Sequence, residues 1–235
     1  MGDDNQAGMG NGPDFTSDRE ALLDVMLGLV PFDGWTMTAM QEAAKDAGIA
    51  DEGAEADRLN LLFPKGITDI LDYWAVREDA AMAAAYDALD EPPARIRDKI
   101  TWLVRQRIEQ LEPHREAARR AAGTLALPAF AGVGPRLIWR TAGAMWVALG
   151  DQSTDGNYYS KRATLSAVYG TTLTRWFAEA AGDGFGEVDA SGTWAFLDRR
   201  IDGVMQIEKL KAQARKVSPD TDAIVGFLGR LRYGG

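Results

Sequence analysis

Several residue types and patterns are missing from this 235-residue sequence, and each absence excludes a class of protein. There is no cysteine, which excludes disulfide frameworks, thiolate zinc sites and a cysteine nucleophile, and indicates a reducing, intracellular compartment. No apolar run approaches the roughly 18 residues that a membrane-spanning helix needs. Residues 1–14 are acidic and glycine-rich and lack the pattern of a signal or transit peptide, so we expect a disordered tail there.

Groups that could carry out catalysis are also scarce. The only histidine, His114, follows Pro113, and no glutamate lies three residues before it to complete a di-iron motif. The carboxylates and arginines are spread along the polar faces of amphipathic helices instead of forming a convergent set. We therefore predict a protein that is not an enzyme and has neither a metal site nor a cofactor.

The net charge of −9 is unevenly distributed along the chain. Residues 1–60 carry three basic and thirteen acidic side chains, a net charge of −10, whereas residues 199–235 carry eight basic and four acidic side chains, a net charge of +4. The N-terminal part should therefore repel phosphate groups, and the C-terminal part should attract them.

Apolar residues recur at helical spacing almost throughout, which predicts an all-α protein. Thr16 or Ser17 can cap a first helix that Pro31 stops, and Thr36 or Thr38 can cap a second that ends at Gly48. Further helices are expected at about 51–60, 62–89, 94–111, 114–126, 132–150, 157–181, 192–216 and 219–235. Pro113 either separates the helices at 94–111 and 114–126 or interrupts a single one.

The run AAKDAGI, followed by a short segment and LFPKGITDIL, resembles the helix-turn-helix of TetR-type regulators. We expect a degenerate version of this motif over residues 15–60. Its second helix would lie in DEGAEADRLN, where four carboxylates face a single base, Arg58, and carboxylates repel the phosphates of DNA. The resemblance implies a TetR-like fold, and the charge predicts that it does not bind nucleic acid. A ligand-responsive TetR-type transcription regulator is the alternative.

The junction GDQSTDGNYYSKR, residues 150–162, is unusually polar for this chain. Four of its residues can cap the helix that follows, namely Asp151, Ser153, Thr154 and Asp155. Capping does not account for Tyr158, Tyr159, Lys161 and Arg162, which crowd into one helical turn. Two aromatics beside two cations cannot all face the core, so we expect some of them at the surface, where Tyr and Arg favour protein recognition.

The segments LIWRTAGAMWVALGDQSTDGNYYSKRATLSAVYGTTL and TWAFLDRRIDGVMQIEK, with the earlier VPFDGW and LLFPKGITDILDYWA, resemble the COQ9 family of ubiquinone-biosynthesis accessory proteins. The resemblance implies a TetR-like, lipid-binding protein that serves the COQ7-type di-iron hydroxylase. It also implies partner contacts at Asp155, Asn157, Tyr158, Tyr159 and Arg162. The sequence departs from its relatives at Gly156, where they tend to carry an aromatic residue, and at Tyr158, where they often carry Trp.

A lipid site needs an apolar cavity between helices, with bulky walls and small residues that leave room. We expect it in residues 61–216, where it would hold an isoprenoid quinone intermediate or a phospholipid. Trp and Met at helical spacing are also typical of an ordinary core, so no single residue decides between the two readings. The candidate lining residues are Trp74, Trp102, Trp139, Met145, Trp146, Tyr169, Leu173, Trp176 and Phe177.

Residues 219–235 form a candidate amphipathic helix with its apolar residues on one narrow arc. Such a helix can lie on a membrane surface, or it can dock on its own core or on a partner subunit. The candidate membrane-binding residues are Ile224, Phe227, Leu228, Arg230 and Leu231. We expect a cytoplasmic protein, peripheral on the inner face of a bacterial-type cell membrane, and a homodimer through its last two long helices.

Overall fold

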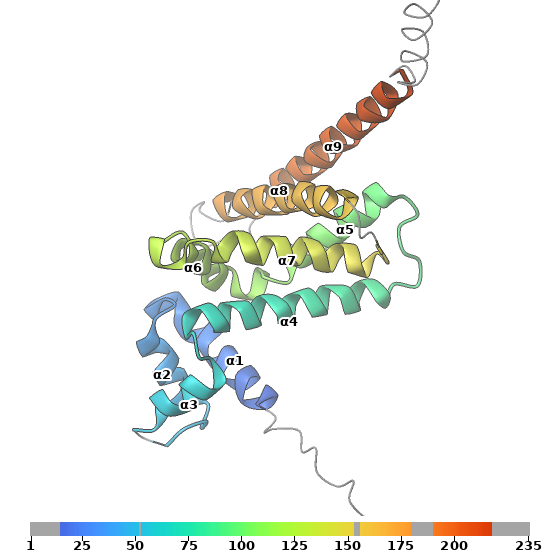
Figure 1. Ribbon diagram of the computed structural model, residues 1–235. Helices are drawn as coiled ribbons and strands as arrows, with labels where there is room; N and C mark the ends of the chain where they lie inside the picture. Colours follow the sequence, from blue (N-terminus) through green and yellow to red (C-terminus); the bar gives the residue numbers. More distant parts are fainter. Residues whose placement is uncertain (1–14, 52, 153–155, 180–189, 218–235) are drawn as a thin grey trace, which may run out of the picture.

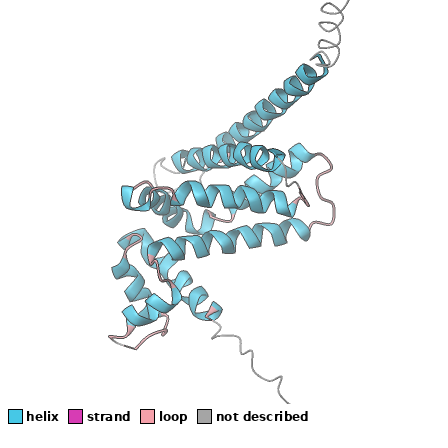
Figure 2. Cartoon of the chain, in the orientation of Figure 1, coloured by secondary structure: helices cyan, strands magenta, loops and turns pink. Residues whose placement is uncertain are grey.

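The computed structural model describes residues 15–51, 53–152, 156–179 and 190–217, and within them every regular element is a helix (Figure 2). The prediction of an all-α fold is confirmed. The order is α1 (Thr16–Asp33), α2 (Met37–Asp46), α3 (Glu55–Leu62), α4 (Ile67–Asp87), α5 (Ile96–Glu109), the 3₁₀ turn η1 (Glu112–His114), α6 (Arg115–Leu125), the 3₁₀ turn η2 (Pro128–Phe130), α7 (Val133–Ala148), α8 (Gly156–Glu179) and α9 (Ser191–Val217).

The long helices form the body of the protein. α4 packs against α7, α7 against α8 and α8 against α9, while α5 contacts α4, α7 and α9. Figure 1 shows α4, α7 and α8 running alongside one another, with α9 projecting away from them. None of the described helices is both long enough and apolar enough to cross a bilayer.

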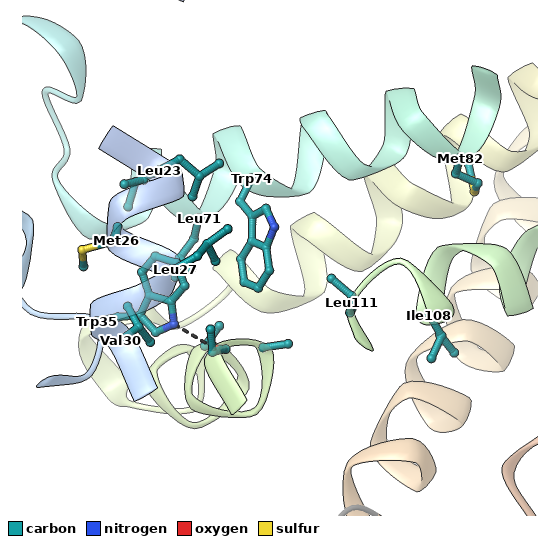
Figure 3. Close-up of a cluster of buried hydrophobic side chains, with 14 of the residues drawn as sticks. Leu23, Met26, Leu27, Val30, Trp35, Leu71, Trp74, Met82, Ile108 and Leu111 are labelled. Atoms are coloured by element: carbon teal, nitrogen blue, oxygen red, sulfur yellow. Dashed lines mark hydrogen bonds between the residues drawn. The ribbon is translucent and has the colours of Figure 1, made fainter. Parts of the chain in front are cut away.

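The first three helices gather at one end of α4 (Figure 1), where α1 packs on both α2 and α6. Trp35, in the turn after α1, joins this end to the body. Its Nε1 donates a hydrogen bond to the carbonyl oxygen of Ala117 (3.0 Å), and its ring centroid lies 5.5 Å from that of Trp74 (Figure 3). Thr36 caps α2 by accepting a hydrogen bond from the backbone N–H of Ala39 (3.1 Å), as one of the two predicted caps.

Some predicted helix ends differ from the structure. Phe15, and not Thr16 or Ser17, stands at the N-cap of α1, without a side-chain cap hydrogen bond. Pro31 does not stop this helix, because the chain turns away only at Gly34, which has a φ of +70° and donates its N–H to the carbonyl of Val30. Pro113 lies in η1, which separates α5 from α6, so the two-helix alternative holds there.

The end of α8 is tied to the start of α9 by one carboxylate. Glu179 Oε2 accepts hydrogen bonds from the backbone N–H of Thr193 (2.9 Å) and from its hydroxyl. These bonds and that to Arg175 outweigh the upward effect of burial, so the pKa of Glu179 is lowered. The proposed tail at 1–14 and the proposed helix at 219–235, with Ile224, Phe227, Leu228, Arg230 and Leu231, lie outside the described residues.

Two glycines test the cost of an added side chain in contrasting settings. Gly66 precedes α4 with a φ of +53°, and a Cβ added there would also lie 2.8 Å from Met37 Sδ, at the flexible end of that side chain. Gly28 lies in α1, and a Cβ added there would meet no neighbouring side chain within 4 Å. We expect Gly66→Ala to lower the free energy of unfolding by about 1–3 kcal/mol, because side-chain-bearing residues rarely adopt this conformation. Gly28→Ala should raise it by about 0.5–1 kcal/mol. Urea denaturation followed by circular dichroism measures the free energy of unfolding of both variants. Equal changes in the two variants would contradict the strain that we assign to Gly66.

Candidate functional site

An apolar cavity of about 400 Å³ lies between α4, α6, α7 and α8, with one residue from α5. Its walls are mostly aliphatic, aromatic and small residues. They comprise Leu71, Trp74, Ala75, Arg107, Leu111, Ala118, Ala121, Ala122, Leu125, Ala126, Gly134, Pro135, Leu137, Ile138, Thr141, Tyr169, Gly170, Leu173, Thr174 and Phe177. Figure 3 shows three of them, Leu71, Trp74 and Leu111, beside the core around Trp35.

Small residues line much of this space. The wall that α6 provides is largely alanine, and Gly170 of α8 faces Ile138 of α7. A Cβ added at Gly170 would lie 3.3 Å from Ile138 Cδ1, so a larger residue there would push the two helices apart or reduce the cavity.

The cavity has an exposed end and a buried end. Its exposed wall residues are Ala122, Ala126, Pro135 and Thr174, which come from the end of α6, the start of α7 and the C-terminal part of α8. Its buried wall residues are Leu71, Trp74, Arg107, Leu111, Ala118, Ala121, Thr141 and Tyr169. The opening therefore lies beside η2, where small side chains leave room.

The buried end contains a polar cluster centred on Asp79 of α4. Asp79 Oδ1 accepts hydrogen bonds from Arg107 Nε (2.9 Å) and from the Thr141 hydroxyl (2.8 Å), and Arg140 Nε lies 3.9 Å from Oδ2. Arg107 is 4% exposed, and Asp79 and Thr141 are also buried. The cluster joins α4, α5 and α7 at one point. Burial raises the pKa of the neighbouring Tyr169, and the charge of Arg107 opposes the rise only in part, so this hydroxyl is neutral.

Four of the nine candidate lining residues lie on the cavity wall: Trp74, Tyr169, Leu173 and Phe177. The other five pack elsewhere. Trp102 lies against Tyr86, Trp139 stacks on Tyr159, Met145 is in the core, Lys161 Nζ lies over Trp146 at 5.2 Å, and Arg115 covers the fully buried Trp176.

The sequence reading missed the polar residues of the cavity. Arg107 follows Leu103 and Val104 at helical spacing, and Asp79 precedes Met82 and Tyr86 in the same way. Each is thus a charged residue on an otherwise apolar stripe, which is the signal that could have found the pair. In the part of the chain that the structure describes, no group of three or more histidine or carboxylate side chains is placed to hold a metal ion.

The polar junction is divided between surface and interior. Tyr159 is 65% exposed, and its ring centroid lies 5.0 Å from that of the half-buried Tyr158. Arg162 is 4% exposed, with its guanidinium 3.5 Å from the centre of the Tyr158 ring, so its side chain supports Tyr158 from within. Asp151 pairs with Lys161 Nζ at 2.7 Å. Ser153, Thr154 and Asp155 lie outside the described residues, and so does the side chain of Asn157.

Comparison with known proteins connects this architecture to one family. The COQ9 family model matches residues 131–208, which span α7, α8 and most of α9. The chain is 28% identical over 217 residues to the ubiquinone biosynthesis protein COQ9, mitochondrial, of Rattus norvegicus, covering 90% of this chain and 65% of the relative. The protein of the same name from Homo sapiens is 26% identical over 219 residues, covering 90% and 64%. The chain thus spans slightly less than two thirds of the length of these relatives.

The Asp79–Arg107 pair can be tested by a double-mutant cycle. We expect Asp79→Leu and Arg107→Leu each to lower the free energy of unfolding by about 3–5 kcal/mol, because each leaves a buried charge without its partner. The double variant should recover most of this loss, since it leaves no charge behind. Urea denaturation gives the free energy of unfolding of the unaltered chain, the two single variants and the double variant. As a control, Asp98→Ala breaks the solvent-accessible pair with Arg95 and should lower this free energy by at most about 1 kcal/mol. Additive losses in the double variant would contradict this account.

Proposed function

We propose that this chain, which belongs to the COQ9 family, is a non-catalytic accessory protein of ubiquinone biosynthesis that binds a lipid and presents it to a COQ7-type di-iron hydroxylase. The observation that carries the proposal is the apolar cavity of about 400 Å³, which is open at one end and has a few polar groups at the other. This size and this distribution of polar groups are typical of pockets for small apolar ligands, roughly 300–1,000 Å³. Much of its wall comes from α7 and α8, within the region that matches the family.

The fold that we propose is TetR-like, with α2 and α3 at the position of the helix-turn-helix. The net charge of −10 over residues 1–60 supports a version that does not bind nucleic acid, since this surface repels phosphates. The packing of α8 on α9, with α9 projecting from the body (Figure 1), supports a homodimer through these two helices.

The proposed membrane contact depends on the sequence pattern of residues 219–235. The apolar arc and the basic residues near it favour a helix that lies on an anionic lipid surface. We propose a place on the inner face of the cell membrane, whereas the rat and human relatives are mitochondrial proteins by name. Contact with the membrane would bring the cavity close to the source of its ligand.

We propose that the hydroxylase binds at the junction, with Tyr159 as its main contact. Tyr159 is the most exposed aromatic side chain of this junction. Its stacking on Trp139 and its edge-to-face contact with Tyr158 hold the ring in place before binding. Arg162 acts indirectly, because its guanidinium lies beneath the Tyr158 ring.

The lipid-binding proposal is tested by extraction of the purified chain with organic solvent, followed by mass spectrometry. We expect an isoprenoid quinone or phospholipid in the extract of the unaltered chain, and a loss of at least about tenfold in Ala122→Trp, because a large ring at the opening blocks entry. Ala84→Trp, at an exposed position of α4 outside the cavity, is the matched control and should retain the lipid. A folded, unaltered chain without lipid would contradict the proposal.

The docking proposal is tested by titration calorimetry against the COQ7-type hydroxylase from the same organism. We expect Tyr159→Ala to weaken binding by about tenfold or more, because exposed aromatic anchors contribute most of the energy of such interfaces. Phe32→Ala removes an aromatic that is 82% exposed in α1 and should leave the affinity unchanged. Equal affinities for Tyr159→Ala and the unaltered chain would place the docking site elsewhere.

A further inference from the structure

The buried end of the cavity contains a guanidinium whose hydrogen bonds are only partly satisfied. Arg107 Nε donates to Asp79, whereas Nη1 is buried and has no acceptor among the residues that the structure describes. Arg107 lines the cavity and is 4% exposed. Because buried donors in native proteins nearly always have a partner, an unpaired nitrogen beside a ligand-sized cavity indicates that the acceptor belongs to a ligand.

The other polar groups of the wall narrow the chemistry of this ligand. The hydroxyl of Thr141 donates to Asp79 (2.8 Å), and that of Thr174 donates to the carbonyl of Gly170 (2.9 Å). Tyr169, which is buried and neutral, lies within the electrostatic influence of Arg107. Arg107 and Tyr169 therefore provide a small polar contact in an otherwise apolar space, which suits one or two oxygen atoms on a largely apolar molecule.

The charge balance favours a neutral ligand over an anionic one. Asp79 already neutralises the charge of Arg107 at 2.9 Å, and both side chains are buried. The second cation of the cluster, Arg140, is itself paired with Asp72 at 2.7 Å. A phosphate at this point would therefore bring a further negative charge into the apolar interior without an unpaired cation to meet it, and such burial is strongly unfavourable. A carbonyl or phenol oxygen can accept the hydrogen bond without adding a charge.

We propose that Arg107 Nη1 is the hydrogen-bond donor for the ring oxygen of a neutral lipid, a quinone carbonyl or phenol oxygen. The apolar tail of this lipid extends toward the opening at Ala122 and Ala126. This role of Arg107 rests on the proposed function. It makes that function more specific, because it favours a quinone-type ligand over a phospholipid. Arg107 is a specificity-determining residue of the cavity, and it carries out no bond-making step.

The test measures how well three probes with the same decyl chain displace a fluorescent apolar dye, N-phenyl-1-naphthylamine, from the full chain. The probes are decyl-benzoquinone, decylbenzene and decyl phosphate. We expect the quinone to bind about tenfold more tightly than decylbenzene, which is the contribution of one hydrogen bond to a charged donor. Decyl phosphate should bind no better than decylbenzene. The carbonyl stretch of the bound quinone should also move to lower wavenumber than in hexane.

Three variants separate the role of Arg107 from a general loss of stability. Arg107→Lys keeps the charge opposite Asp79 and removes the extra nitrogens, and the double variant Asp79→Leu/Arg107→Leu removes the pair without leaving a buried charge. In both, the quinone should bind only as well as decylbenzene, whose own affinity is unchanged. Arg105→Lys, on the exposed face of the same helix, should behave like the unaltered chain.

The outcomes distinguish this inference from the proposed function. If the quinone and decylbenzene bind equally to the unaltered chain, or if Arg107→Lys and the double variant keep the preference for quinone, the role of Arg107 is overturned while lipid binding stands. Tighter binding of decyl phosphate than of quinone overturns the choice of a neutral ligand. If no probe displaces the dye from the unaltered chain, the proposed function fails, and the assignment of Arg107 fails with it.

Discussion

The hydrogen bonds that Asp79 accepts from Arg107 and Thr141 tie α4, α5 and α7 together in the interior of the protein. A buried carboxylate is stable only while its hydrogen-bond donors stay in contact with it. If these three helices slid past one another, the bonds would break and leave a buried charge without a partner. The cavity lies directly beside this cluster. The same bonds that fix the helices therefore also fix the polar end of the space between them.

Helices α1–α3 are attached to the rest of the protein by a different kind of contact. Trp35 both packs against Trp74 and donates to the carbonyl of Ala117, so one side chain contacts α4 and α6 at once (Figure 3). Trp74 in turn lines the cavity. The α1–α3 end is thus connected to the cavity wall by the contact between two tilted indole rings, although it contributes no wall residue itself.

Helical periodicity in the sequence predicts nearly all of the helices, because the apolar stripes are regular and the punctuating residues are clear. It predicts the site less well. Periodicity identifies the buried face of a helix, but not the neighbour that this face meets, and so Trp102, Trp139 and Trp176 were expected in a cavity from which they are absent. Arg107 and Asp79 become meaningful only as a pair, and they are 28 residues apart in the chain. The family resemblance implied a partner contact at Arg162, whereas the structure buries this side chain against the Tyr158 ring.

Under the proposed function, the contrast between the exposed wall residues of the cavity and the buried Arg107 gives ligand exchange a direction. A lipid whose ring meets Arg107 enters ring first and leaves tail first. Partial withdrawal uncovers only the tail, while the ring stays shielded from water and from stray oxidants. Under the proposed function, a redox-active ring would be either fully enclosed or fully transferred, and the cavity would shield it between the two states.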